Sequence, residues 1–426
     1  MQVLWITNIV FPEVYKLLTG KEMSYASGGW MIGAAEALIQ QPDVTLYIAS
    51  LSNEVKQLVR LEGKNNIYYM LPYGKGNNRV NHEYEHYWRQ IRDEIHPDVV
   101  HIHGTELSHG LAYVDACSNK HVVVSIQGLT SVIAEYYDYG LSKSDVFRSI
   151  TLRDVVRGSI YHDKKLFRQR GEYEIELIKK VNHIIGRTNW DRARTWAINP
   201  KANYYFCNEI LRDTFYVGQW KYDKCKKHQI FVSQANYPIK GFHQLLRALP
   251  LVIKEYPDVQ VKVAGGGSVC KTFKQKMMIA GYPNFIAQLI DRLNLDSHIC
   301  FLGTLNEAEM KQEYLSANLF ICPSSIENSP NSLCEAQLLG VPVLAAYVGG
   351  IPDLMKGDEE HLYRFEEVEM LAMMICNVFR SSESFSGDLE RERALIRHNK
   401  KTNVEQLYSI YKTVSDENEC RKSVLD

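Results

Sequence analysis

Two glutamates, Glu327 and Glu335, stand eight positions apart beside the predicted start of a helix. The first backbone amides of that helix, near Asn331, Ser332 and Leu333, have no partner within the helix and lie at its partly positive end. Such an end attracts an anion, and a diphosphate suits it well. The pattern therefore predicts a phosphate-binding helix start with two carboxylates close to it.

The residues on either side place this helix. The apolar run 319–322 predicts a buried strand before it. Ser329 can cap the helix and Pro330 suits its first position, while Gly340 and Pro342 end it. The first glutamate is therefore expected in the loop between strand and helix, and the second within the helix.

Glycines at three other strand ends can bring the backbone close to a ligand. Gly28 and Gly29 follow the first strand and open a helix, so the backbone there can approach a phosphate or a sugar; an ordinary turn is the alternative. The run 265–267 ends a later strand and is equally well a simple strand-to-helix turn. Lys240 and Gly241 follow a third strand, where a solvated turn lysine is the alternative.

Polar side chains also end two strands of the N-terminal half. His103 and Gln127 stand at these ends, and His103 can line a cleft or be a structural histidine with satisfied hydrogen bonds. Thr188 and Asp191 have the spacing of a capping box, which favours a structural role at a helix start.

Short apolar runs alternate with longer amphipathic stretches, which indicates parallel sheets covered by helices on both faces. Strands are expected at 3–7, 43–49, 98–103, 121–126, 229–233, 259–264, 299–303, 319–323 and 342–346. The polar segment 221–228 is interpreted as a linker. The sequence thus predicts an α/β protein with an N-terminal domain at 1–212, a second domain at 228–395 and a C-terminal helix or tail at 396–426.

The glutamate pair and its surroundings resemble the E-x7-E motif of glycosyltransferase family 4, whose members are retaining enzymes with the GT-B fold. The resemblance covers nearly the whole chain and includes the motifs 28–29, 98–101, 240–241, 303 and 349–350. It implies two Rossmann-like, doubly wound domains that face each other across a cleft. Within this family, the chain is similar to the bacterial surface-polysaccharide glycosyltransferases in particular.

The resemblance also implies roles for single residues. Glu327 would accept hydrogen bonds from hydroxyls of the donor sugar and Glu335 from the ribose, because carboxylate oxygens bind vicinal hydroxyls strongly. Lys240 would place a charge beside the diphosphate oxygen that gains charge as the glycosidic bond breaks. Gln234 stands where the family usually has an arginine, and it can still donate a hydrogen bond. Gln127 replaces a usual acceptor-side histidine.

A second set of residues recurs in some family members. Asn208 and Glu209 match an element near the domain junction of those relatives, although no chemical role follows from their types. Gly28, Gly29 and the amides of 331–333 would belong to the donor site, and His103 to the acceptor side.

The expected activity is therefore transfer of a sugar from a UDP- or GDP-linked donor to a glycan or lipid-linked acceptor, in cell-surface polysaccharide synthesis. No cofactor and no metal are expected, because the chain has no Asp-x-Asp pair to hold a cation. A sugar-nucleotide epimerase of the same fold and a catalytically weak glycan-binding or scaffolding relative are the alternatives. A dehydrogenase is disfavoured, since 265–270 lacks the last glycine of Gly-x-Gly-x-x-Gly.

Bulk properties bound the partners and the location. The net charge of −1 does not indicate binding to nucleic acid. The nine cysteines include no C-x-x-C pair, which predicts reduced thiols and no zinc site. The N-terminus does not resemble a secretory signal and no apolar run has the length of a membrane span, so a cytoplasmic protein is expected.

One segment has a charge unlike that of the whole chain. Residues 143–170 carry eight basic and three acidic side chains with apolar residues between them. An amphipathic helical region of this kind can dock on an anionic membrane at the inner face of the cell. The alternative is that its apolar residues pack inside the N-terminal domain and its charges are solvated or bind an acidic acceptor.

Overall fold

The structure is a computed structural model that describes residues 1–23, 28–73, 84–265 and 278–416. The chain forms two compact units. Unit 1 consists of the described parts of Met1–Val132, Arg168–Arg212 and His398–Asp426. Unit 2 consists of the described parts of Ile133–Phe167 and Asp213–Arg397.

Unit 1 is built on one sheet with the strand order β3-β4-β2-β1-β5-β6-β7-β8, parallel except for the β3–β4 pair. Its described strands are β1 (Gln2–Thr7), β2 (Thr45–Ser52), β3 (Val59–Glu62), β4 (Ile67–Pro72), β5 (Val99–His103), β6 (Val122–Ser125), β7 (His183–Gly186) and β8 (Asn203–Phe206). Every residue of β5, β6 and β7 is buried, as expected of central parallel strands covered on both faces.

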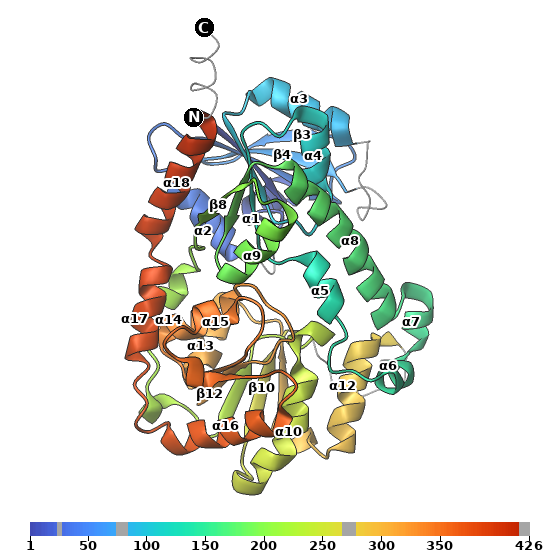
Figure 1. The fold of residues 1–426 in the computed structure, drawn as a ribbon, viewed down its shortest axis with the longest axis vertical. Helices are drawn as coiled ribbons and strands as arrows, with labels where there is room; N and C mark the ends of the chain where they lie inside the picture. Colours follow the sequence, from blue (N-terminus) through green and yellow to red (C-terminus); the bar gives the residue numbers. More distant parts are fainter. Residues whose placement is uncertain (24–27, 74–83, 266–277, 417–426) are drawn as a thin grey trace. The chain divides into compact units, whose positions relative to one another are not determined.

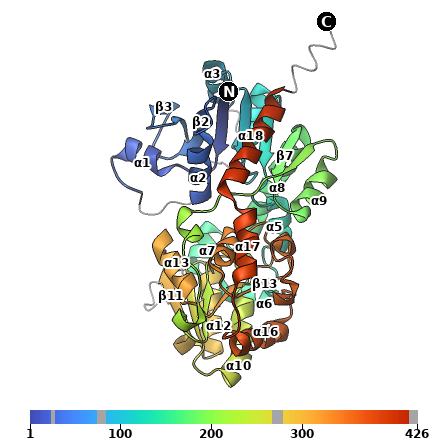
Figure 2. The same cartoon turned by 90° about the vertical axis from the view of Figure 1, so that its left-hand side faces the viewer.

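The helices of unit 1 include one from the far C-terminal part of the chain. Its described helices are α1 (Pro12–Thr19), α2 (Gly29–Leu38), α3 (Glu85–Ile95), α4 (His109–Cys117), α9 (Asn189–Ile198) and α18 (Lys400–Asp416), with parts of α5 (Thr130–Tyr136) and α8 (Ile160–Lys180). Helix α18 lies beside α2 (Figure 2). Its Tyr411 hydroxyl accepts a hydrogen bond of 2.8 Å from the Trp5 indole of β1, which ties α18 to the sheet.

Unit 2 is built on a parallel sheet with the strand order β11-β10-β9-β12-β13-β14. Its described strands are β9 (Gln229–Val232), β10 (Gln260–Ala264), β11 (Ile299–Gly303), β12 (Leu319–Cys322), β13 (Val343–Ala346) and β14 (Leu362–Tyr363). Its described α-helices are α6 (Lys143–Ser149), α7 (Leu152–Arg157), α10 (Phe242–Glu255), α12 (Gly281–Arg292), α13 (Glu307–Ser316), α14 (Asn331–Leu339), α15 (Ile351–Leu354), α16 (Val368–Ser381) and α17 (Asp388–Arg397). Helix α10 packs beside α16, and α6 beside α12 (Figure 1).

The units differ from the predicted domain boundaries in three places. Residues 133–167 pack with unit 2, although they fall within the predicted N-terminal domain. The expected linker at 221–228 is part of unit 2, where the Lys226 amide donates to the Ser316 carbonyl at 2.9 Å. From His398 on, the predicted tail belongs to unit 1 up to the end of α18. Residues 417–426 lie outside the described part of the chain.

Candidate functional site

The helix α14 follows β12 as predicted, but it begins differently. Its first residue is Asn331, and Pro330 stands one position before it as the N-cap, with φ −70° and ψ 119°. No side chain caps the helix, so the expected capping by Ser329 is wrong. Gly340 ends the helix with φ 69°, in the left-handed conformation that glycine favours, as predicted.

The start of α14 leaves two backbone amides available. The Leu333 amide donates to the Pro330 carbonyl at 3.0 Å, so this predicted anion-binding amide is already used. The amides of Asn331 and Ser332 have no partner among the residues that the structure describes. They lie at the positive end of the helix dipole, where an anionic group is stabilised.

Lys240 and Glu327 meet although they are far apart in the sequence. The Lys240 Nζ lies 2.6 Å from the Glu327 Oε1, and the Ser324 hydroxyl donates to the same oxygen at 2.9 Å. The two charged side chains are 24% and 15% exposed, so part of each stays accessible to a ligand. Burial alone would lower the pKa of Lys240, but the charge of Glu327 and the hydrogen bond to it raise that pKa above its ordinary value. Lys240 therefore carries a positive charge at neutral pH.

The backbone holds this pair in place from the side of Lys240. Lys240 ends a short 3-10 turn, Pro238–Lys240, that follows β9. The Ser325 amide donates to the Ile239 carbonyl at 2.8 Å and joins this turn to the loop after β12. Gly241 has φ 65°, and a Cβ atom there would lie 1.7 Å from the Pro323 carbonyl oxygen. Only glycine therefore allows the two loops to approach this closely.

A second contact holds the loop from the side of Glu327. The Gly350 amide donates to the Glu327 carbonyl at 2.9 Å. The neighbouring Gly349 has φ 52°, and a Cβ atom there would lie 1.9 Å from the same carbonyl oxygen. The residues after β13 thus fix the position of the Glu327 backbone.

Two further predicted donor-site residues belong to unit 2. Glu335 lies within α14 as predicted and is buried, with its Oε2 3.5 Å from the Tyr314 hydroxyl. The same hydroxyl donates to the Ser332 carbonyl at 2.9 Å, so Tyr314 bridges the two helix positions. Gln234 follows β9 and is partly buried near Gly265, whose added Cβ would lie 3.7 Å from its Cγ. Residues 266 and 267 of the predicted glycine run lie outside the described chain.

The glycine pair of unit 1 opens α2 as predicted, although α1 precedes it. Gly28 is the N-cap of α2 with φ 73°, and a Cβ atom there would lie 2.4 Å from the Ile9 side chain. A Cβ atom at Gly29 would lie 2.9 Å from the Arg212 side chain. Gly28 therefore needs glycine for its backbone conformation, whereas a side chain at position 29 would require the Arg212 side chain to move. Their approach to a phosphate or sugar stays a prediction.

His103 lies on β5 and faces a small cavity inside unit 1. Its ring packs 4.3 Å from that of Trp5, and neither ring nitrogen has a hydrogen-bond partner among the described residues. Burial, with His101 and Arg187 nearby, holds the pKa of His103 well below its ordinary value, so the ring is neutral. His103 thus lacks the satisfied hydrogen bonds expected of a structural histidine.

The cavity beside His103 has a volume of about 40 Å³, and its wall includes Trp30, Arg187, Asn208 and Glu209. Arg187 and Glu209 form a buried ion pair. Glu209 of the predicted Asn208-Glu209 element therefore has a structural contact inside unit 1. Gln127 follows β6 and is partly exposed. The acceptor-side roles of His103 and Gln127 stay predictions.

The predicted cap of α9 by Thr188 is confirmed, which is one half of the expected capping box. Thr188 is the N-cap of this helix, and its hydroxyl accepts a hydrogen bond of 3.1 Å from the Asp191 amide. The Asp191 carboxylate accepts from the Arg187 amide at 3.0 Å. The Thr188–Asp191 pattern therefore belongs to the structure of unit 1, and no ligand is needed to explain it.

The sequence reasoning missed Glu106, an acidic residue in the loop after β5. Its Oε2 accepts a hydrogen bond of 3.1 Å from the Asn8 side chain, in the loop after β1. Gly104 has φ 90°, which lets the carboxylate fold back over the backbone. Burial, and less strongly the charge of Glu174, raise the pKa of Glu106 to about 7. The sequence signal that could have identified Glu106 is an acidic residue three positions after the histidine that ends a predicted strand.

Glu106→Gln should stabilise the protein at pH 8 and have little effect at pH 5. The pKa of Glu106 is raised from 4.5 to about 7, so the folded state holds the proton that the unfolded state releases between these values. Stability therefore falls as the pH rises through this range, by up to about 3 kcal/mol, and the neutral glutamine escapes the loss. Calorimetric unfolding at both pH values checks this, with the exposed Glu172→Gln as control. Equal effects of both substitutions at pH 8 would contradict it.

One group of described residues has the spacing of metal ligands. Ligand atoms of Asp358, Glu360 and His361 lie within 4.8 Å of one another. Asp358 already accepts a hydrogen bond of 2.5 Å from His361, and the group contains neither Lys240 nor Glu327.

Comparison with known proteins finds a family model and relatives that match part of the chain. Residues 226–381 match the family model described as glycosyl transferases group 1. The chain is 25% identical over 192 residues to the phosphatidylinositol N-acetylglucosaminyltransferase gpi3 subunit of Schizosaccharomyces pombe, covering 44% of this chain and 38% of that relative. It is 30% identical over 162 residues to the D-inositol 3-phosphate glycosyltransferase of Mycobacterium marinum, covering 38% and 32%. The chain thus spans about a third of the length of these relatives.

Solved structures match nearly the whole chain. Sucrose-phosphate synthase from Thermosynechococcus elongatus superposes with a TM-score of 0.70 and 14% identity, over 97% of this chain and 98% of that one. Anabaena Alr3699/HepE in complex with UDP-glucose gives a TM-score of 0.64 and 14% identity, over 97% and 100%. These likenesses confirm the predicted α/β fold class with two Rossmann-like units of the GT-B type. The segment 226–381, which holds Lys240, Glu327 and α14, is similar to the group 1 glycosyl transferases.

Proposed function

We propose that this protein is a retaining, metal-independent glycosyltransferase of family 4. It transfers a sugar from a UDP- or GDP-linked donor to a hydroxyl group of a glycan or lipid-linked acceptor, in the synthesis of cell-surface polysaccharide. The observation that carries the proposal is the Lys240–Glu327 pair, at 2.6 Å, in the segment that matches the group 1 glycosyl transferases. The UDP-glucose bound by the Anabaena protein supports a nucleotide-sugar donor.

The pair suits a donor because its two charges fit the two ends of a sugar diphosphate. The free amides of Asn331 and Ser332, with Lys240, offer positive charge to the diphosphate. Glu327 offers carboxylate oxygens to sugar hydroxyls. Before the donor binds, Lys240 and Glu327 neutralise each other, so neither charge is left unpaired in a partly buried place.

The proposed reaction needs no side chain that acts as a general base. The bond between the anomeric carbon and the diphosphate oxygen breaks, and Lys240 stabilises the charge that this oxygen gains. The acceptor hydroxyl attacks from the face that the diphosphate leaves, and its proton passes to the departing phosphate oxygen. The protein therefore contributes positioning and electrostatic stabilisation.

The product of an α-linked donor should be α-linked. This follows from attack on the face that the leaving group vacates, as the resemblance to retaining enzymes implies. Proton NMR of the isolated product reports the anomeric configuration. A β-linked product would overturn the retaining mechanism, and conversion of the donor sugar without any acceptor would favour the epimerase alternative. A protein that binds donor but neither transfers nor hydrolyses it would be the catalytically weak relative.

Activity should survive excess chelator. The charge that a divalent cation supplies in metal-dependent transfer is supplied here by Lys240 and the amides of α14. Initial rates with and without EDTA, after dialysis, should agree within a factor of two or so. A strict requirement for Mg²⁺ or Mn²⁺, restored by adding the ion back, would contradict this part of the proposal.

The proposed place of action is the inner face of the cell membrane, where a lipid-linked acceptor would be found. No helix within the described residues is long and apolar enough to cross a membrane. We propose peripheral contact with anionic lipid through the segment 143–170, whose basic residues outnumber its acidic ones.

A further inference from the structure

The connection of α6 to α7 exposes an unusual set of apolar side chains. Phe147, Val155 and Val156 are 77%, 76% and 83% exposed, and Ile150 and Leu152 between them are also exposed. We call these five residues the apolar corner. Exposed apolar residues are common singly, but a contiguous group marks a surface that meets another apolar phase.

The apolar corner is held by a defined structure. Ser142 and Thr151 each form a reciprocal capping box, with Asp145 and Asp154 respectively, at the starts of α6 and α7. Such boxes satisfy the first amides of a helix and fix where it begins. Two short helices joined at Ile150 therefore keep their directions, and their outer side chains stay exposed.

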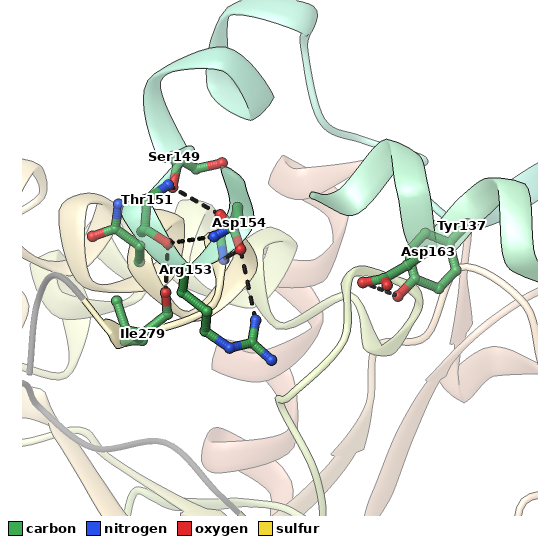
Figure 3. A network of polar contacts seen from close by, with 9 residues as sticks. Tyr137, Ser149, Thr151, Arg153, Asp154, Asp163 and Ile279 are labelled. Atoms are coloured by element: carbon green, nitrogen blue, oxygen red, sulfur yellow. Dashed lines mark hydrogen bonds and ion pairs between the residues drawn. The ribbon is translucent and has the colours of Figure 1, made fainter. Parts of the chain in front are cut away.

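Unit 2 anchors the corner through buried polar contacts (Figure 3). The Thr151 hydroxyl donates to the Ile279 carbonyl at 2.7 Å. The buried Asp154 carboxylate accepts from the Gly281 amide at 3.1 Å, at the start of α12. The Asn284 side chain donates to the Ser149 carbonyl at 3.0 Å. These bonds hold the backbone of the corner against α12 and the residues just before it.

The basic and acidic residues around the corner differ in their exposure and their contacts. Lys143, Arg148 and Arg157 are exposed and form no ion pair among the described residues. The acidic residues are occupied instead: Asp145 caps α6 and lies 3.6 Å from Arg247, and Asp154 is buried. The exposed charged side chains of α6 and α7 are therefore all basic.

Other residues of the segment 143–170 pack within unit 2, although Tyr161 is also exposed. Ile160 is buried, and Phe167 packs with its ring 5.1 Å from that of Tyr137. Lys164 donates to Asp138 at 2.6 Å. These apolar residues pack with unit 2 and not with the N-terminal domain, whereas the five residues of the corner are exposed.

We propose that the apolar corner inserts into the headgroup region of an anionic bilayer, while Lys143, Arg148 and Arg157 contact lipid phosphates. The proposal rests on the proposed function for its purpose, which is to hold the enzyme where a lipid-linked acceptor lies. It narrows the contact from the whole segment to one corner. Membrane binding would then have two contributions. The attraction between basic residues and lipid phosphates weakens as salt is added, and the insertion of apolar side chains does not depend on charge.

An anionic lipid surface fits these observations better than a protein partner does. Five side chains on one corner make a patch smaller than the roughly 800 Å² that each partner of a stable protein interface buries. Its members are aliphatic apart from one phenylalanine, whereas interface hot spots favour Trp, Tyr and Arg. Unpaired basic residues beside apolar ones match the phosphate layer above an acyl layer.

Co-sedimentation of the full chain with vesicles tests the apolar contribution. The triple variant Phe147→Ser, Val155→Ser, Val156→Ser should bind vesicles of phosphatidylcholine and phosphatidylglycerol at least tenfold more weakly than the wild type. The control triple Val217→Ser, Leu389→Ser, Ile396→Ser removes equally exposed apolar residues elsewhere on unit 2 and should bind like the wild type. Exposed positions of this kind change stability little, which unfolding temperatures would verify.

A second variant tests the charges. Lys143→Gln, Arg148→Gln, Arg157→Gln should weaken binding by about fivefold per residue at low salt. Wild-type binding should fall with salt and with the anionic lipid fraction, and the apolar triple variant should be weaker at every salt concentration.

Three results would overturn the proposal. They are equal recovery with neutral and anionic vesicles, no difference between the two serine triples, and an oligomer of the wild type that the apolar triple alone dissolves. The last result would assign the corner to a second copy of the chain. Stabilisation by nucleotide sugars in a thermal-shift assay is measured without vesicles, so failure of the membrane contact and failure of the proposed function are separable.

Discussion

Lys240→Ala should lower kcat by a factor on the order of 10²–10³ and leave the fold intact. This is the usual loss for one electrostatic contact that is stronger in the transition state than in the ground state. The side chain ends a turn whose backbone is fixed by the Ser325–Ile239 hydrogen bond, so its removal does not release the loop. The alanine variant also leaves Glu327 without its cation. We expect the variant to weaken donor binding by a smaller factor than it lowers kcat.

Two companion variants make the Lys240 result specific. Glu327→Gln keeps the shape of the side chain and removes its charge, and it should also lower kcat by about 10²-fold or more. Lys254→Ala removes an exposed lysine at the end of α10 and should leave the rate unchanged. Initial rates at saturating donor, with circular dichroism as the folding check, provide the measurement. Near-native turnover of either site variant with the true substrates would show that the pair is not the catalytic site.

Most of the buried strands were predictable, although the largely buried β4 and the fully buried β7 were missed. Every residue of β5, β9 and β12 is buried, so their sequences are mostly apolar and do not alternate as a half-exposed strand does, although β5 includes two buried histidines. Strands with mixed sequences, such as β3 and β8, are partly exposed and were missed. Strand β14 has only two residues, too few to show a period.

The residues of the candidate site were named from the sequence, but the contact between Lys240 and Glu327 was not predicted. Strand ends place Lys240 and Glu327 at the same sheet edge, since β9 and β12 are neighbours, yet nothing in the sequence states that the two side chains touch. The cap was missed because serine before proline resembles an N-cap, and only backbone angles show that Pro330 holds that position.

Other features depend on contacts between distant parts of the chain. Glu106 has its raised pKa because of burial and of Glu174, which is distant in the sequence. Helices α6 and α7 joined unit 2 because Asp154 bonds to the start of α12, and sequence order alone assigned them to the N-terminal half. Both outcomes follow from tertiary packing, which no local pattern records.

Gly349→Ala should lower kcat/KM at least 10²-fold, an effect as large as that of a catalytic substitution, although residue 349 bears no reactive group. A Cβ atom there would lie 1.9 Å from the Glu327 carbonyl oxygen, so one of the two backbone segments must move. The displaced backbone carries the Glu327 side chain with it and strains the 2.9 Å bond between the Gly350 amide and that carbonyl. A shift of about 1 Å in a positioning residue can cost 10²-fold in rate.

Gly20→Ala separates this displacement from ordinary backbone strain. Gly20 has φ 71°, also in the left-handed region, but a Cβ atom there would meet nothing within 4 Å. Both alanine variants bear the cost of about 1–2 kcal/mol for that conformation, and only Gly349→Ala also forces the site loop to move. Unfolding temperatures and kinetics of both variants decide the matter. If Gly349→Ala lost stability but kept its activity per folded molecule, the position of Glu327 would not matter for the reaction, and its assignment to the donor sugar would fall.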